Sequence, residues 1–507
     1  MASSQTMTRP GQWVTSIVFT LALLVVVALV STDQYTSTII SPSFWAKFRM
    51  AEFPYRMTVL ALVLILVTTC IYLLARRAAD TYVLLTVIAL IALQSNGIKF
   101  GGFDVITVMP LLVILFVLAK SFRQPSFQIA LPGVVFFGLL LLLLDFPYLA
   151  ASHVHSPGRF IINFISLAKG MMVAFVFVNL IRTERHLETA IRAFLAVATV
   201  SALIGIGQIA LNYFTGITIN FASEAAEWKP NFLGMSLRAT GLTTWPSWLS
   251  DFLVLALPFM LFRLINARSM RWRALYAIAI LALLGGIFLT FTYAAYFAAV
   301  LVLAAFPFLC WPRKSVHFVV TLLMVGALFQ IGGGFEWAYE HGLSKVTQST
   351  GMIERRTYLQ STLSEIARDP WAGSGVYAEE EFSENFYRKR VHNTGLQAWA
   401  GLGLPGLLVF VTMMLTMLTQ VWLMSLALRG QDRQLFQALG LGMGAMILEM
   451  FAEPNLTAPI TWFFLGLCQA ALLVYCTWRY PRATLRMPDS GRTKRNLNSP
   501  YRGQAVT

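Results

Sequence analysis

The sequence predicts an all-α membrane protein whose chain crosses the bilayer about twelve to fourteen times. Of its 507 residues, 57% are hydrophobic and 12% are charged, against roughly 45–50% and 25% in soluble domains. The apolar residues gather in runs of about twenty, the helix length that spans a hydrocarbon core. About fourteen such runs begin near residues 13, 57, 81, 104, 127, 160, 190, 248, 274, 293, 315, 392, 433 and 456.

The basic residues assign an orientation, because short loops rich in Arg and Lys stay on the cytoplasmic side. With fourteen spans and a cytoplasmic N-terminus, one side receives Arg9, the C-terminal tail and six segments: "ARRAAD", "KSFR", "RTERHLETAIR", "RLINARSMRWR", "PRK" and "RGQDR". Together they hold 23 of the 38 basic residues and five of the 23 acidic ones. We therefore expect both termini in the cytoplasm, and we attribute the net charge of +15 to retention and lipid-headgroup contact, not to nucleic-acid binding.

The hydrophilic segments divide the chain into four parts. Residues 1–331 are expected to form an N-terminal helix bundle, which includes an extracytoplasmic loop at about 212–247. Residues 332–391 form a larger extracytoplasmic loop, residues 392–480 the C-terminal helices, and residues 481–507 a basic cytoplasmic tail. The four cysteines lie in or at the ends of apolar runs and indicate neither a disulfide nor a metal site.

The larger loop contains the amphipathic stretch "MIERRTYLQSTLSEIARDP". Leu359, Leu363 and Ile366 recur there at helical spacing, which predicts a helix that lies on the membrane or on the helix bundle. Asp369 and Pro370 end this helix, and "WAGSG" follows as a turn of small residues.

His392 stands where the larger loop meets an apolar run, in "RVHNTGLQAWAGLGLPG". The positive end of the helix that begins there disfavours imidazolium, so the ring is expected to be neutral and able to accept a proton. Asn393 is expected to cap the helix or to orient the ring. Pro405 would kink the helix, and four glycines would let another backbone or a bulky lipid-linked ligand approach: Gly395, Gly401, Gly403 and Gly406. The alternative is a capping histidine with glycines that serve only in packing.

Three arginines are expected on the extracytoplasmic side, where this topology places few cations. Arg238 lies in "MSLRATGLTTWPSW" of the smaller loop, and Arg355 and Arg356 lie on the amphipathic stretch. Guanidinium groups suit bidentate binding of phosphate. Beside a candidate base and with no Asp/His metal set nearby, they favour a metal-independent reaction on a lipid-linked pyrophosphate. The alternative for each is an ion pair with the acidic residues of the loop, or a headgroup contact.

Four ionisable residues within or beside apolar runs are further candidates: Lys169, Asp251, Glu449 and Glu453. Lys169 is a candidate for reaching a phosphate, and Glu453 for meeting the acceptor. The alternative interpretation is mutual pairing across helices. His153 and His155 have no carboxylate at ligand spacing, and we interpret their segment as an ordinary loop.

The chain resembles the superfamily of O-antigen ligases and O-antigen polymerases, bacterial inner-membrane glycosyltransferases of the GT-C type. The family signature is H-[N/S/Q], nine residues, G, two residues and G/T/Y, which His392, Asn393, Gly403 and Gly406 satisfy. The segment "ERRTYLQSTLSEIARDPWAGSG" is similar to the family's Arg, amphipathic helix, Asp-Pro and Gly-x-Gly. The segment "RATGLTTWPSWLSDFLVLALPFML" resembles its earlier Arg-containing loop, although polymerase-like members often have Glu-Pro-Ser in place of its Trp-Pro-Ser (residues 245–247).

The resemblance implies transfer of a glycan from undecaprenyl pyrophosphate to an acceptor hydroxyl, with inversion at the anomeric carbon and without a metal or other cofactor. It implies that Arg238, Arg355 and Arg356 hold the diphosphate, while His392 activates or positions the acceptor. The implied partners are the lipid-linked oligosaccharide, a glycan or lipid acceptor, inner-membrane lipids and other polysaccharide assembly proteins, with no nucleic acid.

Three functions stay open at this point. The first is a polymerase of lipid-linked repeat units of an exopolysaccharide or O-antigen, favoured because "RATGLTTWPSW" looks more like the polymerase-type members. The second is a ligase that moves finished glycan to the lipid A core. The third is a polysaccharide transporter or flippase, which has a similar helix number but more often shows repeated halves with broken helices.

Overall fold

The computed structural model describes residues 129–147, 157–217, 237–243, 245–310, 350–373, 375 and 392–479, with 88, 99–100, 103–104, 117 and 324 as isolated positions. The predicted spans near residues 13 and 57 lie outside the described residues, and those near 81, 104 and 315 do so apart from these isolated positions. His153, His155, the tail from 481 and much of the larger loop also lie outside them. The total of twelve to fourteen spans therefore stays a prediction.

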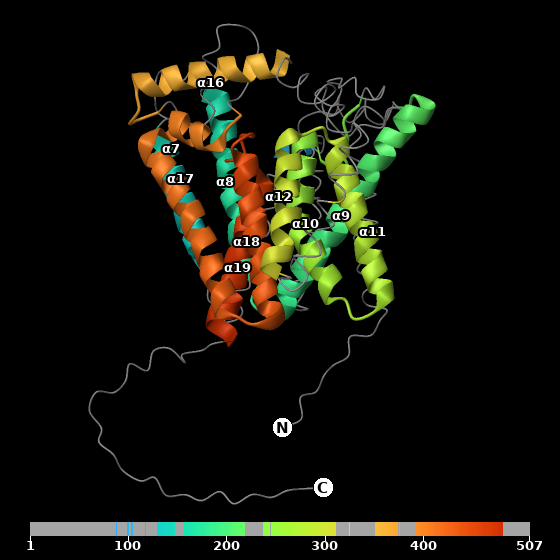
Figure 1. The fold of residues 1–507 in the computed structure, drawn as a ribbon. Helices are drawn as coiled ribbons and strands as arrows, with labels where there is room; N and C mark the ends of the chain where they lie inside the picture. Colours follow the sequence, from blue (N-terminus) through green and yellow to red (C-terminus); the bar gives the residue numbers. More distant parts are fainter. Residues whose placement is uncertain are drawn as a thin grey trace, which may run out of the picture.

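The described residues are almost entirely helical (Figure 1). The helices are α7 (Gly133–Asp145), α8 (Pro157–Leu180), α9 (Glu184–Thr215), α10 (Pro246–Asn266), α11 (Met270–Leu289), α12 (Tyr293–Cys310), α16 (Thr350–Arg368), α17 (Thr394–Ala427), α18 (Gly430–Met450) and α19 (Pro459–Leu473), which continues into η6 (Val474–Arg479). Strands β1 (Lys99–Phe100) and β2 (Phe103–Asp104) pair antiparallel.

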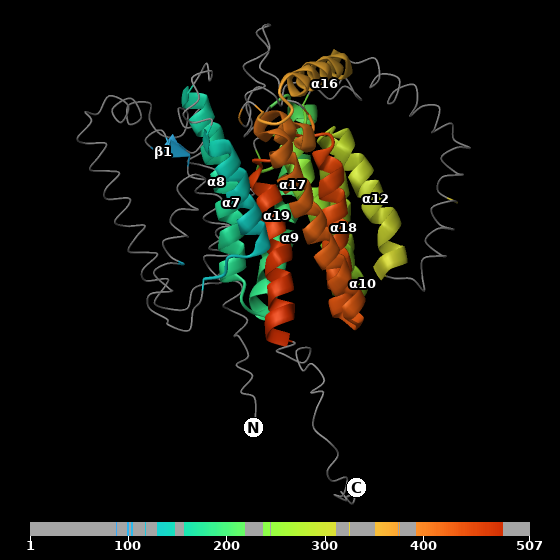
Figure 2. The ribbon, with the colours of Figure 1, turned by 90° about the vertical axis from the view of Figure 1, so that its left-hand side faces the viewer.

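The prediction of an all-α polytopic membrane protein is confirmed. Six helices in the described part of the chain are long and apolar enough to cross a membrane: α9, α10, α11, α12, α17 and α19 with the start of η6. They stand side by side with α7, α8 and α18 in one bundle, and α16 lies across one end of it (Figures 1 and 2).

The basic turns gather at the end of the bundle opposite α16 (Figure 1). Two contacts there join segments that are distant in sequence. Arg263, in the last turn of α10, pairs with Glu188 near the start of α9. Asn266 Nδ2, at the end of α10, donates to Gln434 Oε1 of α18 (2.9 Å). The start of α17, the end of α18 and the connector of residues 451–458 lie at the α16 end. The expected orientation, in which the α16 end faces outward, stays a prediction.

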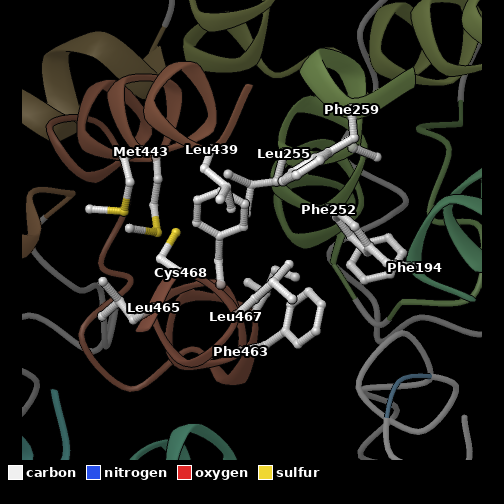
Figure 3. Close-up of a cluster of buried hydrophobic side chains, with 14 of the residues drawn as sticks. Phe194, Phe252, Leu255, Phe259, Leu439, Met443, Phe463, Leu465, Leu467 and Cys468 are labelled. Atoms are coloured by element: carbon white, nitrogen blue, oxygen red, sulfur yellow. The ribbon is translucent and has the colours of Figure 1, made fainter. Parts of the chain in front are cut away.

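Aromatic rings fill the centre of the bundle. Phe194 of α9 meets Phe252 of α10 and Phe463 of α19 edge to face, with ring centroids 5.0 and 5.1 Å apart, and Figure 3 shows these rings beside the sulfur-containing and leucine side chains of α18 and α19. Edge-to-face contacts stabilise such pairs beyond their burial. On α19, a Cβ at Gly466 would lie 2.8 Å from Ala174 Cα of α8, so this glycine lets the two backbones pack closely.

Helix α16 forms where the amphipathic stretch predicts it, and its apolar residues divide between two sides. Ile366 is buried, whereas Leu359 and Leu363 are 41% and 45% exposed. The face turned to the bundle carries Tyr358, Thr362 and Ile366. It is more polar than the pattern suggests because it covers a polar site, which the next section describes.

Candidate active site at the α16 end of the bundle

Arg238 lies in the short segment before α10 and reaches the turn between α11 and α12. Its Nε donates to Thr290 O (2.7 Å), and its Nη2 donates to Thr292 Oγ1 (3.1 Å) and Phe291 O (3.4 Å). Burial lowers the pKa of this guanidinium and the Glu453 carboxylate opposes the shift, but an arginine stays protonated at neutral pH. Its Nη1 forms no hydrogen bond with any residue that the structure describes, which leaves one donor group for a ligand.

Polar side chains of α9 hold the Arg238 segment in place. Gln208 Oε1 accepts from the backbone N–H groups of Thr240 and Gly241, and Ser201 Oγ accepts from Leu242 N. Gly241 has a φ of +55°, and a Cβ there would lie 2.5 Å from the carbonyl oxygen of Ser201. Because buried backbone donors need partners, the sequence "RATGL" adopts one defined conformation against α9.

The start of α17 is tied to the connector of residues 451–458. Asn393 caps α17, since its Oδ1 accepts from Leu396 N (2.9 Å), and its Nδ2 donates to Phe451 O (3.3 Å). Thr394 Oγ1 donates to Glu453 O (2.7 Å) and accepts from Asn455 N (2.9 Å). Of the two roles expected for Asn393, capping is therefore the one with a matching contact.

Glu453 joins the histidine to one of the arginines. Its Oε2 lies 3.6 Å from His392 Nδ1, and its Oε1 lies 3.6 Å from an Nη2 of Arg355 on α16. The Glu453 side chain is 12% exposed and the His392 side chain 32%. His392 Nδ1 is itself buried, so the exposed part of the ring consists of its other atoms. Arg238 also interacts electrostatically with Glu453 and Arg355, so four segments distant in sequence converge here.

Two other predicted residues do not join this group. Arg356 is exposed on the outer side of α16, and it forms no ion pair or hydrogen bond within the described ranges. Lys169 is half-buried in α8, and none of the contacts that join Arg238, Arg355, His392 and Glu453 reaches it. The helical spacing explains the first result, because Arg355 shares the inward stripe of α16, whereas Arg356 shares the outward stripe with Leu359 and Leu363.

The glycines of the motif form a junction between two segments of backbone. Helix α17 breaks at Gly403 (φ 68°, ψ −175°), two residues before Pro405, and the turn after α16 fits into the break. Gly375 N donates to Gly401 O (2.7 Å), Leu404 N donates to Pro370 O (2.9 Å), and Trp399 Nε1 donates to the same carbonyl (3.1 Å). A Cβ on Gly403 would lie 2.0 Å from Trp371 O.

The glycines were expected to admit either another backbone or a lipid-linked ligand. At Gly403 the structure shows the first of these, because the backbone of Trp371 occupies the space beside it. The other glycines differ. A Cβ at Gly395 would meet mainly Asn393, and one at Gly406 would meet Leu402 and Ala398 of its own helix. The predicted kink exists, but its centre is Gly403 and not Pro405, because only a glycine adopts this φ without strain.

Sequence analysis did not identify Thr394 and Asn455, which fix the connector that carries Glu453. The available signal was "FAEPN", a polar turn immediately after an apolar run, at the same end of the bundle as His392. Mutual pairing across helices was one interpretation of the ionisable residues, and Asp251 and Glu449 do meet each other, although the sequence did not indicate which residues would pair.

The fold and this site define an integral membrane protein with an arginine-rich site at one end of its helix bundle, built around a histidine and a carboxylate. Residues 277–411 match the family model described as O-antigen ligase, a segment that contains Arg355 and His392 but neither Arg238 nor Glu453. The match confirms the resemblance to the O-antigen ligase and polymerase superfamily and supports that type of function in general. No match to an individual curated protein was found.

Proposed function

We propose that this protein is a polysaccharide polymerase that joins undecaprenyl-pyrophosphate-linked repeat units of an exopolysaccharide or O-antigen at the outer face of a bacterial inner membrane. The observation that carries the proposal is the convergence of Arg238, Arg355, His392 and Glu453 at the α16 end of the bundle. The family match supports the class of reaction and the lipid-linked substrate.

The two arginines supply the positive charge that the leaving group requires. Arg355 is 43% exposed and Arg238 retains an unused Nη1, so both have donors for phosphate oxygens. As the bond between the anomeric carbon and the pyrophosphate breaks, negative charge grows on the diphosphate. Cations fixed in advance stabilise this charge in the transition state. In this proposal the guanidinium groups replace a metal ion in that role.

His392 is placed to accept the proton of the acceptor hydroxyl. Glu453 faces Nδ1, which favours the tautomer with its proton on Nδ1 and leaves Nε2 as the acceptor. In the proposed step the hydroxyl oxygen attacks the anomeric carbon, its proton moves to Nε2, and undecaprenyl pyrophosphate leaves on the opposite side. A single displacement of this kind inverts the configuration. Glu453 stabilises the imidazolium that forms, as the carboxylate of a catalytic triad does.

A ligase uses the same chemistry on a different acceptor, so the ligase stays the alternative function. The description of the matching family names ligases, while the resemblance of "RATGLTTWPSW" to polymerase-type members favours the polymerase. A flippase is the weaker candidate, since transport needs neither a buried carboxylate beside a histidine nor a fixed pair of arginines.

The proposal is tested with the full chain purified into liposomes that contain a lipid-linked oligosaccharide. We expect a ladder of longer oligosaccharides that remain attached to the lipid pyrophosphate. Transfer to a lipid A core acceptor without such a ladder identifies a ligase. Movement of the donor between leaflets without any transfer contradicts both enzyme functions.

Chelation of divalent cations is expected to leave the rate of transfer unchanged in the same liposomes. The arginines already neutralise the diphosphate, and no group of three or more His, Cys, Asp or Glu within the described residues is arranged to hold a metal. Activity that disappears with a chelator and returns with a divalent cation would contradict this mechanism.

The two neighbouring arginines of α16 provide a matched comparison. Arg355→Ala is expected to slow transfer by about 10²–10³-fold, the usual effect of removing one fixed charge-stabilising donor. Arg356→Ala is expected to have a clearly smaller effect, because its side chain points away from Glu453. Initial rates of chain elongation measure both, with Arg268→Ala at the opposite end of the bundle as the control. Equal losses for the two variants would argue against the placement of Arg355.

A further inference from the structure

A second pair of acidic residues lies directly behind Glu453. Asp251, in the second turn of α10, and Glu449, in the last turn of α18, are 2% and 1% exposed. Their carboxyl groups interact with each other, and Asp251 Oδ2 accepts from Asn455 Nδ2 (3.0 Å). Each carboxyl group keeps one buried oxygen without a partner in the described residues, namely Asp251 Oδ1 and Glu449 Oε1.

The contact between these two groups requires a proton. An ionised carboxylate only accepts hydrogen bonds, so two carboxylates cannot bond to each other unless one of them carries a hydrogen. The described parts of the packed elements α9, α11, α12, α17, α19 and the connector present one other titratable group that interacts with the pair, the Glu453 carboxylate. The remaining polar partner, Asn455, is neutral. Within the described residues no positively charged side chain offsets the pair, so a proton is the group that can keep the two acids together.

The pair also holds the segment that carries Glu453. Asn455 bridges Asp251 and Thr394, and Glu453 N donates to Glu449 O (2.9 Å) within the chain turn that ends α18. Thr394, two positions after His392 in the sequence, donates in turn to the Glu453 carbonyl. The position of the Glu453 carboxylate beside His392 Nδ1 thus depends on the contact between α10 and α18.

We propose that Asp251 and Glu449 are positioning residues that share one proton and thereby hold Glu453 against His392. This inference rests on the proposed function, in which Glu453 orients the catalytic histidine. When the proton is lost, two adjacent buried carboxylates repel each other and also repel Glu453. Asn455 then loses its anchor, and the rate of transfer falls as the pH rises.

Amide substitutions test this proposal without a change of shape. In Glu449→Gln the amide N–H replaces the shared proton, so the hydrogen bond to Asp251 no longer titrates and the charge of the pair equals that of its singly protonated form. We expect this variant to keep its activity at neutral pH and to move the alkaline limb of the pH–rate profile upward by about one pH unit or more, the scale on which such coupled acids interact. Asp251→Asn is the second variant, and Asp432→Asn, at the opposite end of the bundle, is the control that leaves the limb in place.

Infrared difference spectroscopy supplies a readout that does not depend on activity. The full-length protein is expected to show the C=O stretching band of a buried protonated carboxyl group, which disappears in Glu449→Gln and in Asp251→Asn and persists in Asp432→Asn. The same band is expected to disappear over the pH range in which transfer falls. Absence of the band in the unmodified protein overturns the proposal, and so does an alkaline limb that both amide variants leave unchanged. A band without any glycan transfer by the unmodified protein would instead contradict the proposed function.

Discussion

His392→Ala is expected to lower the rate of glycan transfer by about 10²–10⁴-fold, the usual contribution of a positioned general base. The protein is expected to fold normally, because Asn393 and not His392 caps α17. In cells the lipid-linked oligosaccharide is then expected to accumulate on the outer leaflet of the inner membrane. The measurement is the elongation rate in liposomes, combined with leaflet-specific labelling of the donor. Accumulation on the inner leaflet would point to a flippase.

Glu453→Gln is measured beside His392→Ala in the same liposome assay, because Glu453 faces His392 Nδ1. A glutamine cannot stabilise imidazolium, so we expect a smaller loss than for His392→Ala and no further loss in the double variant. Residues that act as a unit give such non-additive effects. Losses that multiply in the double variant would show that His392 and Glu453 act separately.

Gly403→Ala is expected to slow transfer by about 10²-fold, the effect that a misplacement of about 1 Å can have on a fixed catalytic geometry. The φ of 68° strains any residue with a Cβ by about 1–3 kcal/mol. The new methyl group would also collide with Trp371 O. The turn after α16 must then leave the break in α17, and Arg355 moves away from Glu453. A lower unfolding temperature is expected to accompany the loss of activity.

Gly444→Ala is the matched control for this substitution. Gly444 lies within α18, and a Cβ there would meet nothing within 4 Å. Because alanine favours a helix over glycine by about 1 kcal/mol, this variant is expected to be as stable as the unmodified protein or slightly more so. An unchanged transfer rate in Gly403→Ala would show that the junction does not position Arg355.

Local patterns in the sequence predicted the described helices of the bundle, and they pointed to most of the residues that meet in the candidate site. Apolar runs located α7 to α12 and α17 to α19, because in a membrane a span must satisfy its own backbone hydrogen bonds. The loop arginines and the His-Asn boundary pointed to one end of the bundle, where the structure brings Arg238, Arg355 and His392 together with Glu453.

The missed features depend on contacts between distant segments. The apolar spacing of Leu359 and Leu363 predicted the helix α16 but not which side faces the bundle, where Thr362 is buried and Arg355 pairs with Glu453. The contact between Asp251 and Glu449 joins residues nearly two hundred positions apart, and no periodicity in either helix indicates it.

The junction at Gly403 depends on main-chain atoms, and this affects which sequence changes the turn after α16 can accept. Two of its three hydrogen bonds join main-chain atoms to main-chain atoms, and the third ends on a main-chain carbonyl. The identities of the side chains in the turn, such as the 69% exposed Trp371, contribute little to the attachment. Substitutions there can change the exposed surface of the turn while α16 keeps its attachment to α17. Under the proposed function, the surface near the site could therefore vary without a change in the position of Arg355.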